Sequence, residues 1–517
     1  ACGCATANRI PLLVLPGDTF ACRQPDPVLQ QAEFFDNYGR TVTDAFKGVC
    51  HYFDRIIRPE QLMTACINAM RVLTDPADTG AVCLAMPQDV EGEAYDYPEH
   101  FLQKRVWHID RRPVSASQLD RATQMIKSAK KPIIVCGGGV RYSGAEKELQ
   151  ALAEKYNIPV SETQAGKGLI DWNHPLNLGG IGVTGGKAAN VIGRDADLVI
   201  GVGTRFTDFT TSSKWLFNED RKVLGINICP FDAYKMDAQA IVADAKETLT
   251  ALIESLDGYQ TAYTTEIADA KKEWDAIVDE YYSTELEGGL NQTLALGIIN
   301  EFMSEGDIAL GSAGSLPGDM QRLFRPNGVR TYHMEYGYSN MGYEVNGALG
   351  AKLAKPEAEV YTFCGDGSFL MGHSELYTAI QEGLKINICL FDNLGWGCIE
   401  NLQNNQGTDT FGTVFRARNP KTGMLDGDEI AVDFAKIAEG YGAKAYSIRT
   451  SAELKSALED AKKQNRPVLF DIKVLPKTMT PGFESWWRVG VAEVSKSKRV
   501  AEAYDDMQKH IAQTFDY

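Results

Sequence analysis

The sequence contains no run of 18 or more apolar residues, so nothing in it predicts a transmembrane helix. It also shows no positively charged start followed by an apolar stretch, which argues against a signal peptide. Basic residues are too few to balance the acidic ones, and the net charge is -17. Such a chain is a poor partner for nucleic acid or anionic membranes, and a diphosphate ligand would need a cation beside it.

Cysteine pairs of the C-x-x-C type are also absent, although the chain has 11 cysteines. This argues against a cysteine metal site or a redox motif. Several of these residues stand in apolar, strand-like runs, where we expect buried, reduced thiols: Cys83, Cys136, Cys229, Cys364 and Cys389. Reduced thiols are typical of a cytoplasmic protein.

Strand and helix patterns alternate along most of the chain, whose 517 residues exceed one ordinary domain. Strands separated by helices of about 10 to 15 residues predict an α/β fold with parallel sheets covered on both faces. Buried strands are predicted over 10–18, 80–90 and 132–140, and again over 306–314 and 468–476. The charged, aromatic and proline-rich span 95–113 is typical of a linker.

Two predicted strand ends carry the candidate chemistry. The strand over 359–367 ends in Gly365-Asp366-Gly367, and the next strand, over 386–393, ends in Asn393. Ligands of parallel sheets lie at the carboxyl ends of strands, and consecutive β-α-β strands usually lie side by side. Asp366 and Asn393 are therefore expected to face one ion, and their oxygens with phosphate oxygens suit Mg²⁺.

The GDGSF motif, with Asp366 27 residues before Asn393, resembles the thiamine-diphosphate (ThDP) signature of the acetolactate synthase and pyruvate decarboxylase superfamily. The resemblance implies bound ThDP and Mg²⁺. It assigns Asp366, the Asn393 side chain and the Gly395 carbonyl as metal ligands. It also implies contacts to the cofactor from Gly365, Asp366, Gly367, Ser368, Asn393, Gly395 and Trp396.

Two further segments are assigned to the cofactor by the same resemblance. In GSAGSLPGD, Ser315 and Leu316 stand where relatives have a Gln-His pair, so a contact here would use backbone or hydroxyl groups. In SNMGYEVNGALGA, Ser339 and Met341 fall on the aminopyrimidine side. Met341 matches the bulky residue that holds the cofactor bent, and a plain core methionine is the alternative.

Longer segments narrow the resemblance. RIPLLVLPGDTFACRQPDPVLQQ, FDNLGWGCIENLQ and GFESWWRVGVAEVS closely resemble the family of 3D-(3,5/4)-trihydroxycyclohexane-1,2-dione hydrolases, and the similarity runs over the whole chain. This family opens its cyclic dione hydrolytically to 5-deoxy-D-glucuronate in myo-inositol degradation. ThDP acts as the electron sink for carbon–carbon cleavage. We therefore expect a hydrolase acting on carbon–carbon bonds of a ketonic small molecule.

The superfamily's architecture implies three doubly wound parallel-sheet domains, of which the first is incomplete. The implied segments are a pyrimidine-binding remnant with linker (1–112), a central Rossmann-like domain (113–258), a helical connector (259–288), a pyrophosphate- and Mg-binding domain (289–480) and a tail (481–517). Active sites in the superfamily lie between subunits, which implies a homodimer or a dimer of dimers.

The resemblance leaves the catalytic residues unknown. The glutamate that activates the cofactor in relatives lies before the segment that matches Ala1, and no residue here takes its role. We expect a truncated or processed form with weak or no turnover. His373 and Glu400 are candidates for proton transfer, and their plain alternatives are a helix-face histidine and a solvated helix residue.

Other functions remain open at this point. An acetolactate-synthase-like carboligase would release carbon dioxide from pyruvate, and an inactive remnant would bind ThDP, if at all, without consuming dione. The glycine-rich GGGVRYSG (137–144) lacks the G-x-G-x-x-G spacing of a dinucleotide site. Some relatives hold FAD in this domain, and a vestigial site is an open alternative.

Overall fold

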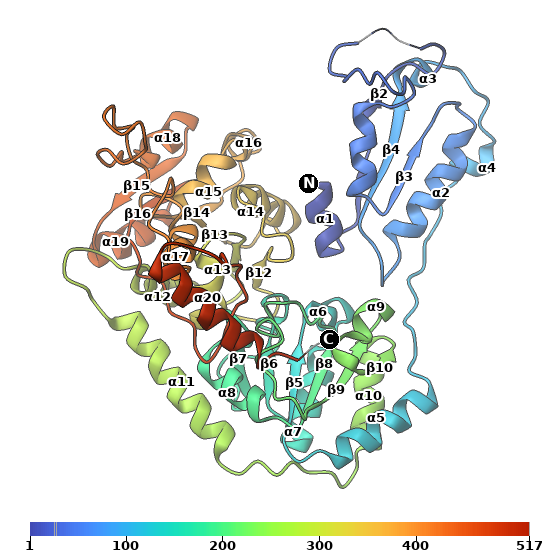
Figure 1. The fold of residues 1–517 in the computed structure, drawn as a ribbon. Coiled ribbons are helices and arrows are strands. Elements are labelled where there is room, and N and C mark those ends of the chain that lie inside the picture. Colours follow the sequence, from blue (N-terminus) through green and yellow to red (C-terminus); the bar gives the residue numbers. More distant parts are fainter. Residues whose placement is uncertain (25, 27, 516–517) are drawn as a thin grey trace. The chain divides into compact units, whose positions relative to one another are not determined.

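The computed structural model describes residues 1–24, 26 and 28–515 (Figure 1). Positions 25 and 27, within the family-like segment 9–31, and residues 516–517, at the end of the expected tail, lie outside the described residues. The chain forms two compact units, residues 1–111 with 337–339 and residues 112–336 with 340–517. Every ladder between its named strands is parallel, which confirms the expected α/β class.

The N-terminal unit is built on a four-stranded sheet in which β4 (Ala81–Pro87) pairs with each of the others. The single strand expected over 10–18 is two strands, β1 (Leu12–Val14) and β2 (Gly17–Asp18). Both pair with β4 in one register, and the interruption falls at Pro16, which has no N–H to donate. The remaining elements are β3 (Tyr52–Arg55), α1 (Cys2–Asn8), η1 (Val42–Gly48), α2 (Gln61–Leu73), α3 (Gln88–Glu91) and α4 (Glu99–Leu102).

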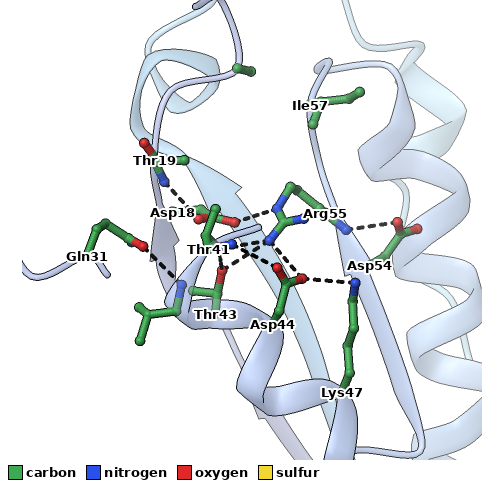
Figure 2. Close-up of polar contacts among 12 residues, drawn as sticks. Asp18, Thr19, Gln31, Thr41, Thr43, Asp44, Lys47, Asp54, Arg55 and Ile57 are labelled. Atoms are coloured by element: carbon green, nitrogen blue, oxygen red, sulfur yellow. Dashed lines mark hydrogen bonds and ion pairs between the residues drawn. The ribbon is translucent and has the colours of Figure 1, made fainter. Parts of the chain in front are cut away.

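A charged cluster ties the loops of this unit to the carboxyl ends of β2 and β3. Figure 2 shows the Arg55 guanidinium among the side chains of Asp18, Asp44, Thr41 and Thr43. Its Nε donates to Asp18 Oδ2 at 2.6 Å, and its Nη2 donates to Asp44 Oδ1 at 3.1 Å and to Thr41 Oγ1 at 2.9 Å. Burial alone would raise the pKa of Asp18, but the hydrogen bond from Arg55 holds that pKa below its usual value.

The central sheet has the order β10-β9-β8-β5-β6-β7. Its strands are β5 (Pro132–Cys136), β6 (Val160–Glu162), β7 (Asn177–Gly180), β8 (Leu198–Val202), β9 (Lys222–Asn227) and β10 (Gln239–Val242). Its helices are α5 (Ala116–Ser128), α6 (Gly138–Ser143), α7 (Glu146–Tyr156), α8 (Lys187–Asp195), α9 (Pro230–Ala233) and α10 (Ala245–Ser255), with short turns η2 (Gln164–Gly166) and η3 (Lys235–Asp237). The strand expected over 132–140 stops at Cys136 because α6 begins two residues later.

The third sheet has the order β12-β11-β13-β14-β16-β15. Its strands are β11 (Ile308–Gly311), β12 (Tyr332–Met334), β13 (Val360–Gly365), β14 (Asn387–Asp392), β15 (Lys444–Ile448) and β16 (Val468–Lys473). The helices of this part are α11 (Glu266–Ser283), α12 (Gln292–Phe302), α13 (Leu316–Leu323), α14 (Tyr343–Ala354), α15 (Asp366–Met371), α16 (Glu375–Gln381), α17 (Gly397–Asn405), α18 (Phe434–Tyr441) and α19 (Ser451–Ala461). The sequence also predicted the tail helix, α20 (Lys498–Ile511).

Buried polar contacts join the central and third sheets within the larger unit. Lys167 Nζ donates to the Gln321 carbonyl at 3.0 Å, and Arg322 Nη2 donates to the Val183 carbonyl at 2.9 Å. The tail adds to this junction, since Phe483 packs edge-on against Trp274 of α11. None of the described helices combines the length and the apolar character that crossing a bilayer requires.

We expect Arg55→Met to destabilise the N-terminal unit by about 2 kcal/mol, because it leaves the buried Asp18 carboxylate without its cation while retaining the side-chain stem. Hydrogen exchange of the β3 and β4 amides measures this loss. The folded pKa values of Asp18 and Asp44 lie below their usual values, so the stabilisation is present near neutral pH and is lost as the pH falls through those folded values. As the pH is lowered, the protection of these amides from exchange should therefore fall less steeply in Arg55→Met than in the wild type.

The matched control is Arg58→Met, because Arg58 lies in the same unit and is exposed beside Glu60. Equal protection in the two variants would contradict a structural role for the Arg55 cluster.

Candidate cofactor site

The candidate site lies at the carboxyl end of the third sheet, where the strand order reverses. β11 and β13 are neighbours, but the chain passes from β11 to β12 on one side and from β13 to β14 on the other. Loops that leave adjacent strands in opposite directions open a crevice, which is the usual ligand site of open α/β sheets. Residues 312–316 follow β11 and residues 366–368 follow β13, so both predicted loops flank this crevice.

Asp366 and Asn393 lie together, as the β-α-β pattern predicted, because β13 and β14 are neighbours. Asp366 Oδ2 accepts hydrogen bonds from the Asn393 N–H at 3.1 Å and from the Gly395 N–H at 2.9 Å. Its Oδ1 accepts one from the Gly367 N–H at 2.6 Å. The strand expected to reach residue 367 ends at Gly365, however, and Asp366 is the first residue of α15.

The Asn393 side chain has an oxygen that could serve as a metal ligand. Its Oδ1 is buried and accepts no hydrogen bond from any residue that the structure describes. Leaving such an oxygen unsatisfied costs about 1–3 kcal/mol. A bound cation would satisfy it, and the neighbouring donors are also hard oxygens, so the residues present fit Mg²⁺.

The charged groups around Asp366 also favour a bound cation. Burial, followed by repulsion from Asp392, raises the pKa of Asp366 to about 8. Asp392 and Asp471 share a single cation, Lys473, whose Nζ lies 2.5 Å from Asp392 Oδ2 and 2.9 Å from Asp471 Oδ2. The second contact is an ion pair without a well-aligned hydrogen bond. Asp366 thus lies beside a pair of carboxyl groups that have one lysine between them, and a divalent cation would balance the excess negative charge.

Two glycines are required by close packing around the Trp396 loop. A Cβ on Gly367 would lie 2.5 Å from Trp396 Nε1, so only glycine admits the indole at this point. Gly395 has φ 156°, and a Cβ there would lie 2.2 Å from the Thr413 carbonyl oxygen. The Trp396 N–H donates to the same carbonyl at 2.8 Å, which anchors the loop that follows β14.

Two of the serines predicted to contact the cofactor, Ser368 and Ser315, are hydrogen-bonded to residues of neighbouring helices. Ser368 is 4% exposed, and its Oγ donates to Glu344 Oε2 at 2.7 Å while it accepts from the Gly342 N–H at 2.8 Å. Ser315 Oγ donates to Gln292 Oε1 at 3.2 Å. Leu316, at the start of α13, is buried.

The structure places the two residues predicted for the aminopyrimidine side in different units. Ser339 is exposed with φ 53° and groups with residues 1–111, whereas Met341 groups with the larger unit. Met341 is half-buried and is part of none of the apolar clusters formed by the described residues. This argues against a plain core methionine. The roles of both residues stay predictions.

The two candidates for proton transfer have structural partners. His373 stacks on Phe369 with ring centroids 5.2 Å apart, and its Nδ1 lies 3.2 Å from the Tyr441 hydroxyl. Glu400 is 8% exposed, so the expectation of a solvated helix residue is wrong. Its Oε1 accepts from Thr410 Oγ1 at 2.7 Å and lies 3.3 Å from Lys477 Nζ.

The glycines of the GGGVRYSG segment are accounted for by packing. A Cβ on Gly137 would lie 2.5 Å from the Gly203 carbonyl oxygen, and one on Gly139 would lie 2.6 Å from the Gly203 Cα. The turn after β5 therefore packs directly against the turn after β8. This close approach explains the glycines without a dinucleotide.

Comparison with known proteins identifies the family. Residues 119–252 match the thiamine pyrophosphate enzyme central domain, and residues 312–472 match the thiamine pyrophosphate enzyme C-terminal TPP binding domain. A 3D-(3,5/4)-trihydroxycyclohexane-1,2-dione hydrolase of Clostridium tetani is 54% identical over 100% of this chain and 84% of the relative. The chain belongs to this hydrolase family. Hydrolases of the same name from Bacillus cereus (55% identical, 99% of this chain, 84% of the relative) and Geobacillus thermodenitrificans (54%, 98% and 83%) agree.

Sequence reasoning missed three charged residues in this member of the hydrolase family. Lys473 and Asp471 alternate in the strand that ends VLFDIK, and a period of two places both on one face of β16. The third, Glu344, is in the first turn of a helix that is mostly small or apolar, apart from residues such as Asn346 and Lys352. That contrast was a readable signal, because a carboxyl among apolar neighbours is either exposed or specifically held.

We expect Lys473→Met to destabilise this hydrolase by about 3 kcal/mol, because it leaves Asp392 and Asp471, each with a side chain only 1% exposed, without a cation. Urea unfolding followed by circular dichroism measures the change. Lys436→Met is the control, because Lys436 forms an exposed pair with Asp433 on the same domain, and it should leave the midpoint unchanged. Equal midpoints for the two variants would contradict the proposed shortage of cations.

Proposed function

We propose that this protein opens 3D-(3,5/4)-trihydroxycyclohexane-1,2-dione hydrolytically to 5-deoxy-D-glucuronate, using ThDP and Mg²⁺. One structural observation carries the proposal: the buried, unpartnered Oδ1 of Asn393 beside Asp366 at the sheet's switch point. The relatives named for this hydrolysis are 54% and 55% identical over 100% and 99% of this chain, which supports the same substrate.

The metal would be held by Asp366, Asn393 Oδ1 and the Gly395 carbonyl. Burial keeps water away from these oxygens, and the Gly367 and Gly395 N–H groups orient the Asp366 carboxylate. Ser368, Gly365, Gly367 and Trp396 are proposed to contact the diphosphate, and Ser315, Leu316, Ser339 and Met341 the rest of the cofactor. When bound, ThDP supplies a nucleophilic carbon and an electron sink, and Mg²⁺ neutralises the diphosphate.

Lys473 has a supporting role in this arrangement. Its ammonium group neutralises Asp392, which lies beside Asp366 and repels it. The negative charge that remains on Asp366 is then available to the metal. Lys473 lies on β16, the neighbour of β14, and pairs with Asp392. Asp392 thus has a structural role, and Asp366 is the carboxylate that would bind the metal.

Three further points belong to the proposal. The segments 113–258 and 289–480 are proposed as the central and the pyrophosphate-binding domains, and the two family matches fall inside them. A cytoplasmic location is supported by buried free thiols on the strands, including Cys136, Cys364 and Cys389. A homodimer or dimer of dimers follows from the superfamily's active sites, which lie between subunits.

The test is loss of the dione by the purified protein, with ThDP and Mg²⁺ present and then omitted. We expect cofactor-dependent loss, reduced on the order of 100-fold or more in Asp366→Asn and Asn393→Ala, because each removes a metal ligand. Asp433→Asn alters a carboxylate on the surface of the same domain and should retain the wild-type rate.

Release of carbon dioxide from pyruvate, with no loss of dione, would replace the proposal with a carboligase.

A further inference from the structure

Glu344 is a buried acidic residue that the proposed reaction does not use. It lies in the first turn of α14 and is 1% exposed. No basic side chain among the described residues forms an ion pair with it. Burial accordingly raises the pKa of its carboxyl above the ordinary value. A buried acid without a counter-ion is costly unless hydrogen bonds hold it, so its partners indicate its role.

Those partners come from three separate segments at the switch point. Glu344 Oε1 accepts from the Ala313 N–H at 3.2 Å, in the loop that follows β11. Its Oε2 accepts from the N–H of Gly342 at 3.1 Å, at the start of α14, and from Ser368 Oγ at 2.7 Å, in the first turn of α15. One carboxyl therefore joins both walls of the crevice to the start of α14.

The contact with Ser368 decides where that serine's single proton points. Ser368 Oγ already accepts the Gly342 N–H at 2.8 Å, so its remaining choices are to donate to Glu344 or to a ligand. Ser368 Oγ donates to Glu344 Oε2 at 2.7 Å, so Glu344 fixes the orientation of this hydroxyl.

The groups that contact Glu344 are neutral. The ionisable group that faces it from β13 is the Cys364 thiol, whose pKa is raised well above the ordinary value by burial first and by Glu344 second. The contacts from α15 and from the loop after β11 are the Ser368 hydroxyl and the Ala313 N–H. Hydrogen-bond donors, rather than a cation, therefore hold this carboxyl in place.

We propose that Glu344 is a positioning residue for ThDP, whose carboxyl holds the loop after β11 and the start of α15 against the start of α14 and fixes the orientation of the Ser368 hydroxyl beside the crevice. This inference rests on the proposed use of ThDP, and it assigns a role to a residue that the cofactor motifs do not include. Glu344 acts through Ser368 and through the loop positions rather than by contact with the reacting atoms.

The experiment measures ThDP affinity in the presence of Mg²⁺ by quenching of tryptophan fluorescence, with Trp396 beside the site as reporter, and by calorimetry. Glu344→Ala should weaken binding about 10-fold or more, because it removes three hydrogen bonds to the crevice loops. Glu344→Gln should bind ThDP more tightly than Glu344→Ala, because its one carbonyl oxygen can still accept some of these hydrogen bonds. Ser368→Ala should also weaken ThDP binding. The double variant, Ser368→Ala with Glu344→Ala, should bind ThDP with about the same affinity as the single variant that binds it less tightly.

The matched control is Glu162→Ala in the central sheet. Glu162 is 2% exposed and also accepts from a backbone N–H, that of Gly168 at 3.0 Å, and from Asn177 Nδ2 at 3.2 Å. Its loss should lower the urea midpoint as Glu344→Ala does but leave ThDP affinity unchanged. If Glu344→Ala does not fold, Glu344→Asp carries the test, because the shorter side chain cannot span all three partners and should bind ThDP more weakly than Glu344→Gln.

The outcomes separate the two proposals. A wild-type protein that binds no ThDP overturns the proposed function before any variant is made. Wild-type affinity in Glu344→Ala, or in Glu344→Asp if only that variant folds, overturns the positioning role while the proposed function stands. Additive losses in the double variant would overturn the action through Ser368.

Discussion

The carboxyl end of the third sheet is organised by a shortage of positive charge. Asp366, Asp392 and Asp471 are buried within two neighbouring strands and the helix that follows a third, and Lys473 pairs with Asp392 and Asp471 but not with Asp366. Carboxyl groups removed from water either take up a proton or find a cation. The raised pKa of Asp366 and the unpartnered oxygen of Asn393 are two consequences of this single constraint. A magnesium diphosphate meets both.

Parallel strand topology explains why these groups meet. β11 and β13 are adjacent but lead away in opposite directions, so the loops after them cannot close over each other. The crevice between them is crossed by the Glu344 carboxyl rather than by the chain itself. The loop after β14 is fixed from the other side, where Trp396 lies over Gly367 and donates its backbone N–H to Thr413. The site is therefore held by side chains and by glycine contacts, and its precision depends on them.

Sequence patterns predicted much of this arrangement. The proximity of Asp366 and Asn393 was predicted from one β-α-β unit, because the two strands of such a unit usually lie side by side. The buried thiols followed from apolar runs. The burial of Glu400 was not predicted, because its partners Thr410 and Lys477 lie on loops and no local sequence pattern indicates these contacts. The helical start at Asp366 was missed for a related reason, since Gly-Asp-Gly is equally typical of a turn.

The sequence by itself determined the α/β class, the order of strands along the chain and the identity of the residues at the strand ends, because these depend on local period and on spacing. Only the tertiary structure decided which side chains are left without partners and which loops one carboxyl can reach. Asn393 Oδ1 and Glu344 show the difference. Their chemistry depends on burial and on hydrogen bonds between segments up to 31 positions apart, and such contacts exist only once the sheets have packed.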